Sequence, residues 1–229
     1  MSIPSRSLVL FDIDGTLLRG AGLHHRNALI DGVRRVSGHV TTLDGVATSG
    51  MLDRDLIAGM LRASGASDRQ IRSQMTEIVR ECQRSYLENC TVDLRPFVCR
   101  AVPETLEQLQ AQGAVLGLVT GNLSEIGWRK IELAGLRSYF SVGAFAEDGK
   151  TRSRLALVAA RRALREKLVE KNCRISLIGD HPNDIAAAKA NGFQAVAVAT
   201  GLMPFEELAR ETPDILVEHL SDLDLEKLL

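Results

Sequence analysis

Short apolar runs alternate along the chain with segments whose apolar residues repeat at helical spacing. The clearest runs are Leu8–Phe11, Val115–Val119, Ile175–Ile178 and Ala195–Ala199, with a weaker one at Phe140–Phe145. Runs of four to six mostly apolar residues that stop at Asp, Thr or Gly are typical of a strand buried on both faces. The pattern therefore predicts a strand at each run.

The segments between these runs indicate helices. We expect helices at 103–112, 124–133, 153–169 and 182–190, the first beginning with Pro103 and the last followed by Asn191-Gly192, which are start and stop signals. Strands that alternate with helices form a parallel sheet with helices on both faces. The chain is therefore predicted to be an α/β protein with a three-layer, Rossmann-like parallel sheet at its core.

One long segment interrupts the alternation. From about Leu23 to Asn89 the pattern is helical throughout, with turn signals at Ser37-Gly38 and Ser64-Gly65. A block of this length exceeds a simple crossover between the first and second strands. We therefore expect an inserted, all-helical cap domain at residues 19–96, within a catalytic core made of residues 1–18 and 97–229.

Composition narrows the class of protein and its partners. The 229 residues are 45% hydrophobic, which is enough to bury a large core. The formal net charge of −1 gives no surplus of basic residues for binding nucleic acid. The apolar stretches fall short of the roughly 18 residues of a membrane span. The four cysteines form no Cys-x-x-Cys pair, which favours free thiols in a reducing compartment. We expect a cytoplasmic monomer or homodimer that binds neither nucleic acid nor membrane.

Polar residues follow the predicted strands at the ends where they stop. The four turns are Asp12-Ile13-Asp14-Gly15-Thr16-Leu17, Thr120-Gly121-Asn122, Glu147 to Arg152, and Gly179-Asp180 to Asp184. Ligands of open parallel sheets bind beyond the carboxyl ends of the strands. The four turns are therefore expected to meet at one site.

The residue types in these turns favour phosphoryl transfer. Carboxylates crowded into one cleft repel each other, and a divalent cation with oxygen ligands such as Mg²⁺ relieves this repulsion. Thr120 and the amides that follow it, near a helix start, can bind phosphate oxygens. A cation, Lys150 or Arg152, can neutralise the remaining charge. Asp12 is the natural nucleophile, and Asp14 can protonate the leaving oxygen and then activate water.

The same motifs resemble a known family. Asp-x-Asp-Gly-Thr-Leu, Val-Thr-Gly-Asn and Gly-Asp-x-x-x-Asp occur in this order, as in the haloacid dehalogenase superfamily, and the chain is most similar to its phosphoglycolate-phosphatase-like group. The resemblance covers nearly the whole chain, since the helical insertion looks like that superfamily's mobile cap. It implies a Mg²⁺-dependent phosphatase that hydrolyses a small phosphorylated metabolite through an aspartyl-phosphate on Asp12, with Asp14 as acid and base.

The resemblance also assigns the binding groups. The metal would be held by the Asp12 carboxylate, the Asp14 carbonyl and Asp180, with Asp184 supporting the metal's waters, and the phosphate by Thr120, Gly121 and Asn122. The third motif departs from the family pattern because no proline follows Lys150-Thr151-Arg152. Lys150 occupies the usual lysine position, whereas Arg152 matches a subset that uses arginine, and we slightly prefer Arg152. Arg54 is the cation of the insertion that we expect near substrate.

Other functions are alternatives to that of a phosphatase. A sugar-phosphate mutase keeps the same core residues and stays open, and a non-catalytic metabolite-binding protein would not need both Asp12 and Asp14. A phosphonatase uses a cap lysine, and this chain has no lysine before Lys130. His24 and His25, just after the first junction, are expected at the surface of a helix start rather than at the substrate, and His181 in a solvent-facing loop.

Overall fold

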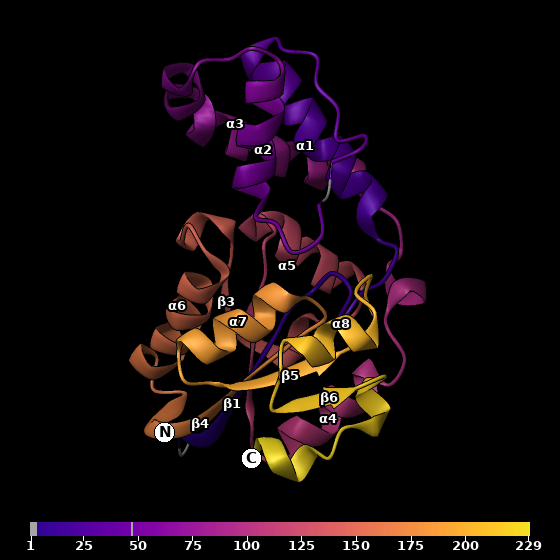
Figure 1. Ribbon diagram of the computed structural model, residues 1–229, viewed down its shortest axis with the longest axis vertical. Helices are drawn as coiled ribbons and strands as arrows, with labels where there is room; N and C mark the ends of the chain where they lie inside the picture. Colours follow the sequence, from indigo (N-terminus) through magenta and orange to yellow (C-terminus); the bar gives the residue numbers. More distant parts are fainter. Residues whose placement is uncertain (1–3, 47) are drawn as a thin grey trace.

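The computed structural model describes residues 4–46 and 48–229, so residues 1–3 and 47 of the expected core and insertion lie outside it. Within the described residues, six strands form one parallel sheet in the order β3-β2-β1-β4-β5-β6 (Figure 1). The strands are β1 (Ser5–Phe11), β2 (Val115–Val119), β3 (Phe140–Ala144), β4 (Val169–Gly179), β5 (Gln194–Val198) and β6 (Ile215–Val217).

The strand order reverses at β1, which pairs with β2 on one side and β4 on the other. Successive residues of β1 point to opposite faces: Leu8 and Leu10 belong to one buried cluster, Val9 and Phe11 to the other. Such a reversal opens a crevice at the carboxyl ends of the central strands. Asp12 follows β1 directly and is thereby placed at this crevice.

Helices cover both faces of the sheet, as expected. On one face α6 contacts β2, β3 and β4, and α7 contacts β4 and β5; on the other, α4 contacts β2. The core helices are α4 (Val102–Ala111), α5 (Ser124–Leu133), α6 (Arg152–Arg165), α7 (Pro182–Ala190) and α8 (Phe205–Arg210). The predicted three-layer α/β architecture is confirmed.

Some element bounds differ from the sequence pattern. The helix expected at 153–169 ends at Arg165, because Lys167 takes a positive φ and Val169 already begins β4. β4 starts six residues before the apolar run at Ile175, with mostly exposed polar residues, so hydrophobicity alone does not show this part. β6 and α8 are too short to give a periodic signal and were not expected.

The helical insertion contains α1 (Gly22–Ser37), α2 (Asp53–Ala63) and α3 (Asp68–Asn89), with α1 packed along α3 and α2 against both. The expectation that the segment is helical throughout is wrong for the described residues between 38 and 52, which lie outside any helix. Gly38, Gly45 and Gly50 have φ angles of 75°, 73° and 68°, a left-handed conformation that breaks a helix and that glycine adopts without strain.

Two adjacent segments connect the insertion to the core. The Cys99 amide donates to the Leu17 carbonyl at 2.9 Å, and the Arg19 amide donates to the Phe97 carbonyl at 2.8 Å. In Figure 1 the three helices stand beyond the end of the sheet at which α5 lies. The boundaries at 18/19 and 96/97 remain a prediction. Across the residues described here, no helix combines the length and the apolar character that a membrane crossing requires.

Candidate active site

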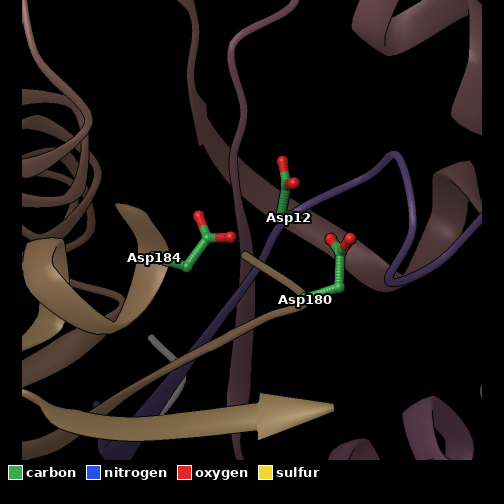
Figure 2. A group of neighbouring side chains, drawn as sticks. All are labelled: Asp12, Asp180 and Asp184. Atoms are coloured by element: carbon green, nitrogen blue, oxygen red, sulfur yellow. The ribbon is translucent and has the colours of Figure 1, made fainter. Parts of the chain in front are cut away.

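Three buried carboxylates meet at the crevice beside β1. Asp12, Asp180 and Asp184 each place a carboxylate oxygen within 4.8 Å of the others, and Figure 2 shows the three side chains converging. We call these residues the acidic cluster. They come from the end of β1, the end of β4 and the first turn of α7. The structure therefore joins motifs that lie 168 residues apart in the sequence, as the shared strand edge predicts.

Backbone pairing and small residues bring the three carboxylates together. The Asp12 amide donates to the Ile178 carbonyl at 2.9 Å, which aligns the ends of β1 and β4. The Thr16 hydroxyl donates to Asp180 Oδ1 at 3.1 Å. A side chain at Gly15 would collide with the Asp180 carboxylate, and one at Gly179 with that of Asp184. Glycine at both positions therefore leaves the space that the acidic cluster occupies.

The acidic cluster is electrostatically incomplete. Burial, with repulsion from Asp12 and Asp184, raises the pKa of Asp180 to about 8. Burial and Asp12 raise the pKa of Asp184 to about 7 against the opposing effect of Arg152. Within the described chain, both buried carboxylate oxygens of Asp184 lack a hydrogen-bond partner. A bound divalent cation would favour the ionised form of these carboxylates. It would also give their oxygens a partner, either directly or through its bound waters. The residues therefore fit a metal ion.

Arg152 is the cation that reaches the acidic cluster. Its Nη1 donates to Asp12 Oδ1 at 2.9 Å and to the Val119 carbonyl at 3.2 Å, and its Nε lies 3.4 Å from Asp184 Oδ1. Burial would lower the pKa of Arg152, but Asp12 and Asp184 hold it above its usual value. Lys150 is exposed, outside the cavity described below. Thr151, which caps α6 through the Arg154 amide at 3.2 Å, separates the two cations.

Asp14 points toward a second charged group rather than toward the acidic cluster. Both of its carboxylate oxygens accept from Lys130 Nζ, at 2.8 and 2.7 Å, and Oδ2 also accepts from Asn122 Nδ2 at 2.7 Å. Burial alone would raise the pKa of Asp14, yet the charge of Lys130 and the hydrogen bonds from Lys130 and Asn122 hold it below its usual value. Because the Asp14 side chain is still 41% exposed, it can reach a ligand in the cavity.

The segment from Thr120 to Asn122 lies between the two charged groups. Thr120 Oγ1 accepts from Asn122 Nδ2 at 2.6 Å, and both side chains are buried. A side chain at Gly121 would collide with the Met51 carbonyl of the helical insertion. Glycine at this position therefore lets the insertion approach the phosphate-binding turn that the sequence predicts.

Core and insertion together line a partly open cavity of about 550 Å³. The core contributes Asp12, Asp14, Thr120, Arg152 and Asp180 among others, and the insertion contributes polar and apolar groups that include His25, Asp53, Leu29, Leu43 and Leu56. Arg54 is exposed and does not line this cavity, because one residue along a helix turns the side chain about 100° away from Asp53.

Three residues of this site carry no motif in the sequence analysis: Lys130, Asp53 and His25. Lys130 is completely buried in α5, and a lysine on the apolar face of a helix, near Ile126 and Ile131, is the signal that could have identified it. The expected surface position is wrong for His25, whose side chain is 14% exposed and lines the cavity. His181 is part-buried, accepts from the Asn183 amide at the start of α7 and abuts Gly50 of the insertion.

Comparison with known proteins gives consistent matches over most of the chain. A family model for haloacid dehalogenase-like hydrolases matches residues 7–192. The "Probable phosphatase IndB" of Dickeya dadantii is 26% identical over 222 residues, covering 95% of this chain and 92% of that protein. A phosphoglycolate phosphatase of Shigella dysenteriae is 26% identical over 233 residues, covering 94% and 90%. The crystal structure of a β-phosphoglucomutase from Clostridium difficile has a TM-score of 0.69 at 16% identity, covering 97% and 95%, and this likeness concerns the fold alone.

Proposed function

Because the chain belongs to the haloacid dehalogenase-like hydrolase family, we propose that it is a phosphatase that hydrolyses a small phosphorylated metabolite through an aspartyl-phosphate on Asp12. The observation that supports this most directly is the position of Asp12. Its carboxylate lies beside Asp180 and Asp184, accepts from Arg152 at 2.9 Å, and lines the cavity.

Asp12 is the nucleophile in this proposal. One of its carboxylate oxygens forms a bond to phosphorus while the bond from phosphorus to the ester oxygen breaks, and the departing oxygen takes a proton. Water then attacks phosphorus, loses a proton, and releases inorganic phosphate with Asp12 restored. Arg152 orients the Asp12 carboxylate and neutralises charge on the transferred group.

Asp14 moves the proton at the leaving oxygen. In its protonated form it gives that proton to the leaving group, and as a carboxylate it recovers one from the attacking water. Thr120, Gly121 and Asn122 hold the phosphate oxygens, with Asn122 also hydrogen-bonded to Asp14 at 2.7 Å.

Mg²⁺ is the cofactor that we propose for the acidic cluster. The Asp12 and Asp180 carboxylates and the Asp14 carbonyl would hold it, with Asp184 supporting its waters. When bound, Mg²⁺ would supply positive charge that draws in and orients the phosphate. The ionised forms of Asp180 and Asp184, which burial disfavours, are then the stable ones.

The enclosing insertion favours a small substrate. A cavity of about 550 Å³ between the two parts of the chain suits a metabolite rather than a phosphorylated protein. The relatives named phosphatase and phosphoglycolate phosphatase support a phosphate monoester of that size. We expect the protein to act in the cytoplasm as a monomer or homodimer.

A panel of phosphorylated metabolites tests the proposal, with release of inorganic phosphate as the readout. Wild-type protein with Mg²⁺ should hydrolyse a small monoester, and Asp12→Asn should lose on the order of 10⁶-fold in kcat, as removal of the nucleophile does in a serine protease. Asp55→Asn, an exposed carboxylate of α2, is the matched control and should keep full activity. Isomerised sugar phosphate without phosphate release would indicate a mutase, and binding without turnover would indicate a non-catalytic protein.

A further inference from the structure

Lys130 is a buried cation whose three N–H donors are all used. Besides the two oxygens of Asp14, its Nζ lies 2.7 Å from Asn122 Oδ1 and 3.1 Å from His25 Nδ1. An ammonium group is costly to bury unless it is paired and hydrogen-bonded. Two of the three partner residues belong to the core, and the third, His25, belongs to α1 of the helical insertion.

His25 is itself held by a second residue of the insertion. An imidazole that accepts at Nδ1 from an ammonium group carries its proton on Nε2. Nε2 lies 2.8 Å from Asp53 Oδ2, so it donates to that buried carboxylate. The partners of His25 therefore fix its tautomer and its ring orientation.

Asp53 joins the same network to the phosphate-binding turn. Its Oδ2 also accepts from the Leu123 amide at 2.8 Å, and its own amide donates to the Gly121 carbonyl at 2.8 Å. These bonds flank Asn122, which hydrogen-bonds to both Asp14 and Lys130. The start of α2 thus holds the residue that helps to hold Asp14.

From this arrangement, and resting on the proposed function, we propose that Lys130 is a positioning residue for Asp14 and that His25 and Asp53 complete it only when the helical insertion lies against the core. Lys130 fixes the Asp14 carboxylate at the cavity, and His25 supplies the acceptor for the third N–H of Lys130. If the insertion moved away from the core, His25 and Asp53 would leave with α1 and α2. Lys130 would then lack one acceptor, and the turn around Asn122 would lose two hydrogen bonds. Proton transfer is thereby linked to closure over the substrate.

A salt bridge that only stabilises the fold would show the same contacts, so the test must report on Asp14. With 4-nitrophenyl phosphate the leaving group needs little protonation, whereas hydrolysis of the aspartyl-phosphate still needs a base. Lys130→Met should therefore lower kcat by about 100-fold, the lower range for loss of acid–base catalysis, and acid-quenched samples should contain accumulated phosphoenzyme. Lys171→Met, at an exposed lysine, should change neither.

A double-mutant cycle separates positioning from stability. If Lys130 acts through Asp14, adding Lys130→Met to Asp14→Asn should change kcat less than about 3-fold, because the interaction is already lost. Equal losses in both backgrounds, or a Lys130→Met protein without accumulated phosphoenzyme, would overturn the proposal. If wild-type protein releases no phosphate at all, the proposed function fails instead.

His25 tests the contribution of the insertion and does not depend on a stable Lys130 variant. His25→Ala should lower kcat by less than the roughly 100-fold expected for Lys130→Met, with phosphoenzyme accumulation, and the adjacent His24→Ala, outside the cavity, should not. Adding His25→Ala to Lys130→Met should then have little effect. Wild-type kcat and no phosphoenzyme in His25→Ala would show that the insertion takes no part in positioning Asp14.

Discussion

Two groups of buried charges face the same cavity, and they are completed in opposite ways. The acidic cluster is built by residues of the core, and burial together with repulsion between neighbouring carboxylates raises the pKa values of Asp180 and Asp184. The lysine cluster, made of Lys130, Asp14, Asn122 and His25, satisfies its own charges and hydrogen bonds and includes a residue of the insertion. The difference indicates that a ligand from outside the chain would complete the acidic cluster, whereas contact between the insertion and the core completes the lysine cluster.

Removal of metal should have the largest effect, because the acidic cluster is the group that we propose to hold an external cation. A chelator should abolish phosphate release, and Mg²⁺ should restore it. Ca²⁺ should restore little, because it prefers a larger and looser oxygen shell. Phosphate release is measured after dialysis and after addition of each ion. Full activity in excess chelator would show that Arg152 alone compensates the acidic cluster.

Loss of the internal cation should come next. Arg152→Met should lower kcat/KM by about 100-fold, within the usual range for removal of one group that stabilises transition-state charge. Lys150→Met, two residues away but exposed, should change it less than about 2-fold because exposed charges have little effect. The reverse outcome, with Lys150 essential and Arg152 dispensable, would give Lys150 the catalytic charge.

The two groups should also differ in their effect on stability. Lys130→Met should lower the free energy of unfolding by about 3 kcal/mol, the lower end for a broken buried ion pair because Asp14 is part-exposed. Asp184→Asn should instead leave the metal-free protein as stable or make it more stable, because it removes a buried charge with excess negative neighbours. Denaturant unfolding without metal measures both. Equal destabilisation by the two changes would remove the contrast.

The smallest expected effect is a pH dependence of the metal-free protein. The folded pKa values of about 8 for Asp180 and about 7 for Asp184 lie above their ordinary value, so the folded state binds more protons than the unfolded state in between. The preferential protonation of Asp180 and Asp184 in the folded state stabilises the fold fully below the ordinary pKa of a carboxyl group, near 4. It is lost as the pH rises to about 8.

Thermal unfolding measures this loss of stability between pH 5 and pH 8. The lower limit is about one unit above the ordinary pKa of a carboxyl group. The midpoint should fall as the pH rises in metal-free protein, and Mg²⁺ should flatten the curve because it favours the ionised carboxylates. Asp184→Asn should reduce the slope. A midpoint that rises with pH in metal-free protein would mean that Arg152 already keeps both groups ionised.

The sequence predicts the core-built part of the site far better than the part that the insertion completes. Asp12, Asp180 and Asp184 each follow an apolar run or open a helix, so strand order and the carboxyl-edge rule are enough to bring them together. Lys130 and His25 are brought together by the packing of α1 against α3 and of α3 against α5, which involves contacts between helices far apart in the sequence. Local pattern carries no information on that docking, and His25 therefore resembles a surface residue.

The differences between the expected and the observed secondary structure also result from contacts between residues far apart in the sequence. The sheet and its helices follow from hydrophobic periodicity, but β6 has only three part-buried residues and gains its place by pairing with β5. Arg54 and Asp53 are neighbours in the sequence, yet only Asp53 faces the core, because the register of α2 is set by the hydrogen bond between the Asp53 amide and the Gly121 carbonyl. Whether a segment forms a helix or a strand can be predicted from the local sequence. The orientation of the insertion on the core depends on contacts between residues far apart in the sequence.

Identification of a phosphorylated aspartate tests the central claim most directly. Asp14→Asn protein should be mixed with Mg²⁺ and 4-nitrophenyl phosphate, quenched in acid, digested and analysed by mass spectrometry. We expect one phosphate on the peptide that carries Asp12, and none when Asp12→Asn is added. A phosphate on another residue, or phosphate release without any phosphoenzyme in either protein, would contradict an aspartyl-phosphate mechanism at Asp12.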